Sequence, residues 1–160
     1  MQLWEAGLQE FDELVGIDWE WQRLEGAMTK APFGGAATGA NPTDRGKRGT
    51  KRSTLSEGHG LPLAIAVAGA NVHDTQLVAA TLEAVVVARP TGSQHRCLDA
   101  GYVGEKTATV VQAQGSVAPV RPRGEDTANA GSADPTKTPR RWVVERLHSW
   151  LNRSRRLLVR

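Results

Sequence analysis

The sequence predicts an α/β domain in which helices cover a mixed β-sheet. Three observations support this fold class. Residues 17–32 alternate apolar and polar side chains, which is typical of a half-buried strand. Residues 75–88 and 140–160 instead repeat apolar side chains at the spacing of an amphipathic helix. Strand-like and helix-like segments also alternate along the second half of the chain, as they do when helices pack on the faces of a sheet.

The composition describes one ordinary globular domain. A chain of 160 residues, 39% hydrophobic and 23% charged, is long enough to bury a core and is not biased toward disorder. The single cysteine, Cys97, excludes an internal disulfide framework and a cysteine-based zinc site. No apolar run reaches the length of a membrane span, and no signal-peptide pattern opens the chain. We therefore expect a cytoplasmic protein.

The net charge of +3 is small, but the charges are segregated along the chain. Acidic residues dominate the first twenty-five positions. Basic residues dominate segments 45–52 and 137–160. Two separate basic segments favour a polyanionic partner such as nucleic acid, although basic clusters are also common on faces that only contact solvent.

The chain is predicted to begin with a helix followed by a strand. Residues 1–15 carry apolar side chains at helical spacing, and Gly16 ends this helix. The alternating strand 17–32 comes next. Residues 34–49 are rich in glycine and alanine, which predicts a loop.

A β-hairpin and a second helix follow. Strands 51–57 and 61–68 flank a turn at Gly58-His59-Gly60. Asp74 precedes the apolar pattern of residues 75–88, so we expect Asp74 to cap that helix rather than to act as an acid in catalysis.

The second half predicts short strands between helices. Residues 95–98 and 117–120 read as strands, and residues 105–114 as a helix. Residues 121–139 are rich in glycine, alanine, proline and threonine, which predicts a mobile surface loop. The helix at 140–160 ends the chain.

This last helix has two chemically different faces. Val143, Leu147 and Trp150 share one face, and we expect Trp150 to be a packing anchor rather than a platform for base stacking. Glu145 and His148 share the other face. His148 there either touches a metal or DNA, or is an ordinary surface histidine.

Three acidic positions form a candidate metal site. Asp99 follows an apolar strand, where α/β sheets place ligand-binding groups. Glu145 lies on the polar face of the last helix, and either Glu25 or Asp18 supplies an acid from the first strand. Carboxylates gathered from three distant segments suit Mg²⁺ or Mn²⁺. The alternative is that each acid is a turn residue, a cap or half of a surface ion pair.

Seven segments of the chain together carry the motifs of one family: 26–32, 39–52, 60–63, 69–74, 98–102, 140–146 and 150–153. Through these segments the chain resembles the catalytic part of bacterial insertion-sequence transposases of the DDE type. That resemblance implies an RNase H-like fold for residues 16–160, including the mobile loop 121–139, and makes residues 1–15 the remnant of an upstream region. It also implies a bacterial, nucleoid-associated location.

The same resemblance assigns the catalytic and metal-binding acids. The family's second acid stands in an Asp-x-Gly-Tyr sequence, which corresponds to Asp99. Its final glutamate follows an arginine by four residues, which corresponds to Glu145 after Arg141. The first acid is normally an aspartate before a small residue, and that register falls on Glu25, with Asp18 as the alternative. A glutamate is one methylene longer and shifts a bound ion, which at such a site costs on the order of 100-fold in rate per ångström.

The family chemistry implied is phosphoryl transfer on DNA with two divalent ions, Mg²⁺ or Mn²⁺, about 3.5–4 Å apart. Water first nicks the element end, and the freed 3′-hydroxyl then attacks target DNA. Partners implied are the element ends, the target DNA, further copies of the chain and an upstream N-terminal polypeptide. The expected DNA-phosphate contacts are Arg45, Lys47, Arg48, Lys51, Arg52, Arg141, Arg153, Arg155 and Arg156.

Three functional hypotheses follow. The first is a DNA transposase that performs metal-dependent strand cleavage and strand transfer for an insertion sequence. The second is a truncated, catalytically inactive DNA-binding remnant, which the altered first acid at Glu25 favours. The third, a nuclease acting on RNA–DNA hybrids, shares the carboxylates but not the transposase-like segments.

Overall fold

A computed structural model describes residues 2–91, 94–98, 102, 105–113, 116–117 and 141–153. Several expectations fall on positions outside those residues: Asp99, the loop 121–139, Arg155 and Arg156. The side chains of Arg141 and Glu145 are likewise not described, although both residues lie on a helix. Across the described residues, no helix is long and apolar enough to cross a membrane.

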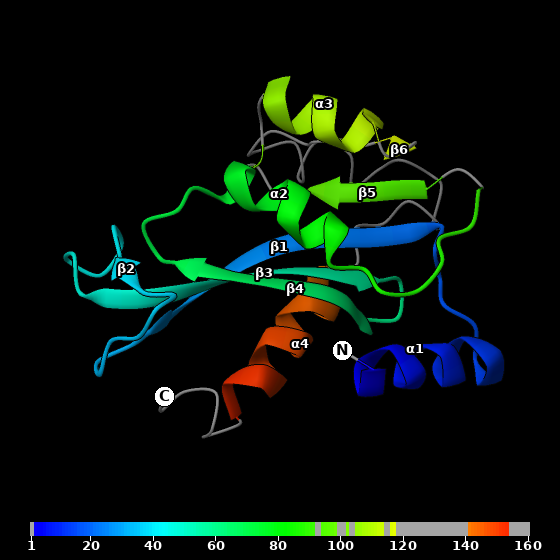
Figure 1. Cartoon of the computed structure of the whole chain (residues 1–160), viewed down its shortest axis with the longest axis horizontal. Helices are drawn as coiled ribbons and strands as arrows, with labels where there is room; N and C mark the ends of the chain where they lie inside the picture. The colour runs from blue at the N-terminus through cyan, green and yellow to red at the C-terminus, as the bar shows by residue number, and fades with distance from the viewer. Residues whose placement is uncertain are drawn as a thin grey trace.

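The described strands form one mixed sheet, ordered β2-β3-β1-β5-β6, with β4 also paired to β3 (Figure 1). β1 runs antiparallel to β3 and parallel to β5, and β3 and β4 form the predicted hairpin. The strands are β1 Trp21–Lys30, β2 Gly39–Ala40, β3 Arg48–Glu57, β4 Pro62–Gly69, β5 Gln94–Leu98 and β6 Ser116–Val117.

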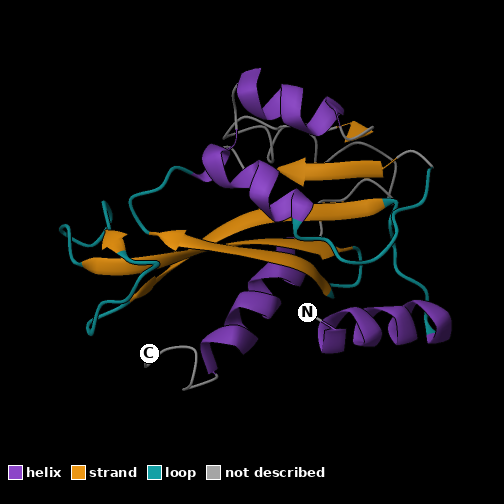
Figure 2. Cartoon of the chain, viewed as in Figure 1, coloured by secondary structure: helices purple, strands orange, loops and turns teal. Residues whose placement is uncertain are grey.

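Helices cover both faces of this sheet (Figure 2). Two neighbouring residues of β3 contact helices on different faces. Ser53 accepts a hydrogen bond from Thr81 of the helix α2, while Arg52 donates to Asn152 of α4. Because successive strand residues point to opposite faces, α2 and α4 lie on opposite sides of the sheet. The helices are α1 Gln2–Leu14, α2 Asp74–Glu83, α3 Glu105–Ala113 and α4 Arg141–Arg153. The predicted mixed sheet flanked by helices is confirmed.

The apolar core lies on the α2 side. Leu24 of β1 and Leu55 of β3 are directly opposite each other and fully buried. They pack in one cluster with Val78 and Leu82 of α2 and Val111 of α3. The strand and helix periodicities therefore place their apolar residues in one shared layer.

Some predicted boundaries differ from the structure. The strand expected at 17–32 begins at Trp21, because Asp18 holds a turn by accepting a hydrogen bond from the Trp21 amide. The helix expected at 75–88 ends at Glu83. The loop expected at 34–49 contains the two-residue strand β2, too short to leave a pattern in the sequence.

The expectation that Asp74 caps α2 was wrong. The N-cap is His73, whose Nδ1 accepts from the Thr75 amide at 3.4 Å. Asp74 is the first helical residue, and its carboxylate lies 2.9 Å from Nζ of Lys51. That buried lysine draws the carboxylate toward the sheet and away from the helix terminus.

The expectation for the faces of α4 was only partly right. Leu147 is buried as expected, but Trp150 is 60% exposed and is no packing anchor. Asn152 is exposed, and it accepts a hydrogen bond at 2.6 Å from Nη2 of Arg52. A buried cation on the sheet needs a polar partner, and the polar face of the helix supplies it here.

Candidate active site

Glu25 lies in the middle of β1, on the face that α4 covers. Its Oε2 is 3.3 Å from Nε of Arg23, two residues earlier on the same face. Arg52 lies opposite Ala27, the next residue along that row, and bonds to α4. Arg23, Glu25 and Arg52 therefore form a row of charge beneath the last helix.

The parallel pairing of β1 with β5 places the end of β5 beside Glu25. Leu24 pairs with Leu98, the last residue of β5. The next residue in the chain is Asp99, whose own placement is not described. Glu25 is thus the β1 residue that follows the last pair in the register, at the edge where the chain continues to Asp99.

Asp18 lies at the other end of this strand pair. It precedes Trp21, which pairs with His95 near the beginning of β5. Its amide donates to Oε2 of Glu57 at 3.2 Å, and its carboxylate holds the turn before β1. The register favours Glu25 over Asp18 as the acid next to the end of β5.

His148 of α4 is partly buried against this row of charged residues. Burial, followed by repulsion from Arg52 and Arg23, lowers the pKa of His148 below its ordinary value. Both ring nitrogens are buried and lack a hydrogen-bond partner among the described residues. We call Arg23, Glu25, Arg52, His148 and Asn152 the charged layer. Glu145 precedes His148 by three positions, one turn earlier on the helix.

Within this layer, Glu25 has the donor chemistry that suits a divalent ion. Glu25 contributes carboxylate oxygens, which Mg²⁺ and Mn²⁺ prefer. Its Oε2 is buried. Within the described part of the chain no three His, Cys, Asp or Glu side chains gather around one point. Of the three acids Glu25, Asp99 and Glu145, Glu25 is the one whose side chain is described.

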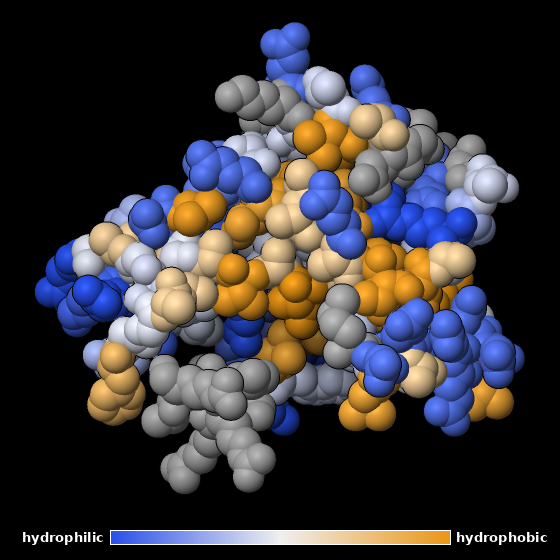
Figure 3. All heavy atoms as spheres, viewed as in Figure 1, coloured by the Kyte–Doolittle hydropathy of each residue, from blue (hydrophilic) through white to orange (hydrophobic). Residues whose placement is uncertain are grey.

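The basic residues divide into an exposed and a buried group. Arg45, Lys47 and Arg48 are exposed around the β2–β3 turn, together with Lys30 at the end of β1. We call these four the basic tip; it lies at the left end of the molecule in Figure 1, where hydrophilic residues gather in Figure 3. Arg153 is also exposed, at the end of α4.

Lys51 and Arg52, also expected to contact DNA, are buried. They are 6% and 8% exposed. Lys51 binds Asp74 and donates to the carbonyl of Val72 at 2.7 Å, while Arg52 binds Asn152. Both cations are engaged within the chain, so the exposed surface for DNA is narrower than the basic segment 45–52.

Arg23 was not among the residues predicted from the sequence. Its signal was the alternation of β1 itself, since Arg23 and Glu25 are two residues apart and must share a face. Lys30 was missed for a different reason. It joins the basic tip only through the antiparallel pairing that places it opposite Gly49.

Comparison with known proteins identifies the family. A model of the transposase DDE domain matches residues 15–160. The chain belongs to this family. The putative transposase for insertion sequence element IS402 of Burkholderia cepacia is 33% identical over 138 residues, which cover 80% of this chain and 61% of that protein. The resemblance to insertion-sequence DDE transposases is confirmed, and the chain spans less than two-thirds of that relative's length.

A solved structure, the Mos1 strand transfer complex, is similar with a TM-score of 0.46 and 12% identity, over 94% of this chain and 51% of that one.

Proposed function

We propose that this DDE transposase domain carries out metal-dependent cleavage and joining of DNA strands, with Glu25, Asp99 and Glu145 as the catalytic and metal-binding acids. The observation that carries the proposal is the strand register. Leu24 pairs with Leu98, so Glu25 stands at the edge where the chain continues to Asp99. α4, which bears Glu145, covers the same face through His148 and Asn152.

The chain's own residues have separate tasks in this proposal. Glu25, with Asp99 and Glu145, would hold Mg²⁺ or Mn²⁺. Arg23 lies 3.3 Å from the carboxylate of Glu25 on the α4 face and balances its negative charge. Divalent ions bound there would supply charge stabilisation for in-line phosphoryl transfer, and the family chemistry uses two of them.

DNA would cross the charged layer and extend toward the basic tip. Glu25 pairs across from Thr54, and Lys30 pairs across from Gly49, five residues further along β1. At about 3.4 Å per residue the tip lies about 17 Å from Glu25. That distance lets the tip hold phosphates several nucleotides from the reacting one. Further copies of the chain and an upstream polypeptide belong to the same proposal as partners.

A nicking assay tests the proposal. Supercoiled plasmid is incubated with Mg²⁺ or Mn²⁺ and the wild-type chain, Glu25→Asp or Glu145→Gln. Nicking by the wild type, abolished in Glu145→Gln, supports the acid assignment. Nicking by Glu145→Gln at the wild-type rate would remove Glu145 from the site.

The second candidate function is an inactive DNA-binding remnant. One observation favours it: the first acid is a glutamate, one methylene longer than the family's aspartate. If only Glu25→Asp nicks the plasmid in the same assay, the fold can support catalysis, and the glutamate at position 25 has abolished the activity of this chain. DNA binding without nicking by any variant would support the remnant.

A further inference from the structure

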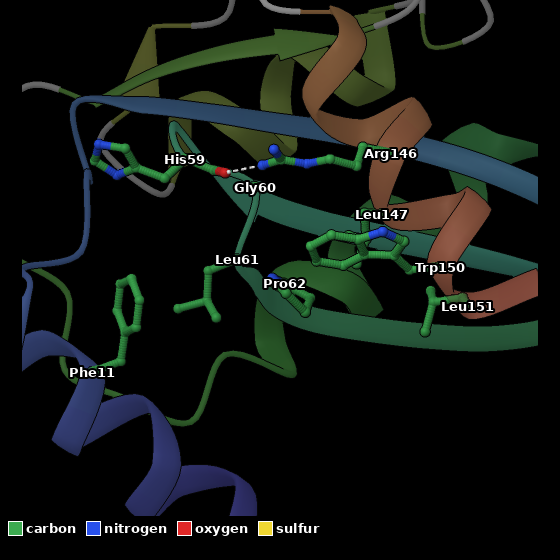
Figure 4. A pocket seen from close by; sticks show the side chains of 9 residues that line it. All are labelled: Phe11, His59, Gly60, Leu61, Pro62, Arg146, Leu147, Trp150 and Leu151. Carbon is green, nitrogen blue, oxygen red and sulfur yellow. Dashed lines mark hydrogen bonds between the residues drawn. The ribbon is translucent and has the colours of Figure 1, made fainter. Parts of the chain in front are cut away.

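A groove of about 610 Å³ lies outside the charged layer, between α1, the β3–β4 turn and α4 (Figure 4). Its floor is apolar, and two aromatic side chains, from α1 and from α4, stand at its sides. Volumes of about 300–1,000 Å³ are typical of small-molecule sites. The floor and side residues are Leu61, Pro62, Leu147, Leu151, Phe11 and Trp150.

Trp150 and Arg146 form one unit on the side of α4. They are four residues apart and so share a helix face. The guanidinium carbon of Arg146 is 5.3 Å from the centroid of the Trp150 ring, within the range of a cation–π contact. Arg146 also donates to the carbonyl of His59 at 3.0 Å (Figure 4). The indole nevertheless remains 60% exposed, which leaves aromatic surface available to a ligand.

The opposite side of the groove is held in place by a buried carboxylate. Glu57 is 1% exposed, and its Oε1 accepts hydrogen bonds from the amides of His59 and Leu61 at 2.9 and 2.8 Å. Its Oε2 lies 2.9 Å from Nδ1 of His59. The β3–β4 turn is therefore fixed before any ligand arrives, which reduces the entropy lost on binding.

We propose that this groove binds an unpaired nucleobase of a DNA strand, with the base stacked on Trp150 and a neighbouring phosphate held by Arg146. The inference rests on the proposed function. It adds a subsite for single-stranded DNA beside the acid-bearing stretch of α4. Base stacking on an aromatic side chain beside a basic group is how proteins hold single strands without reading their sequence.

Charge and position favour a nucleotide over an apolar protein segment. The described part of α4 contains three arginines and one acid, Glu145. Arg146 follows Glu145 directly, and Trp150 comes five residues after it, about 7.5 Å along the helix axis. A strand with its reacting phosphate near Glu145 would therefore meet Arg146, which also lines the groove, before Trp150.

The test compares two single-stranded oligonucleotides of equal length, one with pyrimidine bases and one made only of abasic sugar phosphates. Fluorescence anisotropy gives the affinity of each for the wild type, Trp150→Ala, Trp150→Phe and Trp4→Ala. Trp4 is the matched control, since it is 39% exposed on α1 and does not line the groove. Thermal unfolding of each variant confirms that the fold is retained.

We expect Trp150→Ala to weaken binding of the base-containing strand by about 5- to 150-fold and to leave the abasic strand unaffected. Trp150→Phe keeps most of the affinity, and Trp4→Ala behaves as wild type. Equal loss for both strands, or no loss for either, overturns the proposal. So does a Trp150→Ala variant that changes self-association in sedimentation while its DNA affinity stays constant, because the groove would then be a protein contact.

A plasmid nicking arm with the same variants separates this inference from the proposed function. Metal-dependent nicking by the wild type, without any base-dependent effect of Trp150, overturns the subsite and leaves the acid site standing. Failure of the wild type to bind either single strands or duplex DNA overturns both.

Discussion

Leu24 and Glu25 are neighbours on β1, yet they belong to different layers of the molecule. Leu24 faces α2, is fully buried and packs in the apolar core with Leu55 and Val78. Glu25 faces α4, lies 3.3 Å from Arg23 and shares its face with Arg52. The same strands therefore carry stability on one face and candidate chemistry on the other.

The apolar core and the charged layer are stabilised by different interactions. In the core, removing apolar surface from water is itself favourable. In the charged layer each buried or half-buried ion needs a partner. Arg23 pairs with Glu25, and Arg52 bonds to Asn152. A layer held by a few polar contacts is open to rearrangement around DNA phosphate and metal, whereas the close-packed core is not. Substitutions on the two faces should consequently separate activity from stability.

Nicking activity should fall most when the acid of the charged layer is replaced. Glu25→Gln keeps the size of the side chain but removes its charge, so we expect nicking to fall at least about 1,000-fold, equivalent to about 4 kcal/mol of transition-state stabilisation. The unfolding free energy should change by less than about 1 kcal/mol. Rates of plasmid nicking and urea unfolding curves measure both. Comparable losses in the two would mean that Glu25 is structural.

The reverse pattern is expected one residue earlier. Leu24→Ala leaves a cavity among Leu55, Val78 and Leu82, so it should lower the unfolding free energy by about 2–5 kcal/mol. Urea unfolding measures the loss. At temperatures where the variant stays folded, its nicking rate should remain within a few-fold of wild type. A selective loss of nicking in this variant would show that the layers are not independent.

A polar network on the core side gives a smaller effect on stability. Arg96 is fully buried, and it donates to Gln22 and Gln94 at 3.1 Å each. Burial, with repulsion from Arg89, lowers its pKa to about 10. Arg96→Leu removes the arginine donor to the Gln22 side-chain carbonyl and should cost about 1–3 kcal/mol in urea unfolding. The control is His95→Gln, which changes an exposed neighbouring residue. If Arg96→Leu were as stable as wild type, the Arg96 network would not contribute to stability.

The basic tip should affect affinity without affecting folding. Replacing Lys47 and Arg48 with serine removes two exposed cations. The slope of log affinity for duplex DNA against log salt should become smaller by about 1.8, since each phosphate contact contributes about 0.9. Titrations at several salt concentrations measure this slope. An unchanged slope would place the DNA elsewhere.

The smallest effect expected is a pH dependence that arises from His148. Its pKa is lowered by burial and by Arg52 and Arg23, so the folded state takes up the proton less readily than the unfolded chain. The stability gained from the neutral ring is fully present above the ordinary value of about 6.5 and is lost as the pH falls through the lowered value. Glu25, paired with Arg23, also faces this layer. His148→Phe should therefore lose less stability than wild type between pH 7 and 5, measured by thermal unfolding.

The core layer could be predicted from the sequence because its signals are local. Alternation along β1 and helical spacing along α2 each point to one apolar face, and those faces meet in the structure. The hairpin and the last helix were also predictable, from turn residues and periodicity. Segments shorter than a repeat, such as β2, left no pattern to read.

The charged layer depends on contacts between distant residues, and the sequence predicted it less well. Arg52 was expected on the surface as part of a basic run, but pairing of β3 with β1 and α4 buries it. Trp150 was expected to be a packing anchor, but it is exposed, and the contact of α4 with Arg52 comes from Asn152. A buried polar contact cannot be predicted from one segment alone, because it forms only when two distant segments pack together.

Binding of Mn²⁺, followed by electron paramagnetic resonance, can show whether Glu25 is a metal ligand without DNA and without turnover. The wild-type chain is compared with Glu25→Gln and with Asp18→Asn, whose acid lies at the other end of β1. We predict that Glu25→Gln weakens Mn²⁺ binding by at least about tenfold, while Asp18→Asn binds as wild type does. Loss of binding in Asp18→Asn, with Glu25→Gln unaffected, would contradict the assignment of Glu25 to the active site.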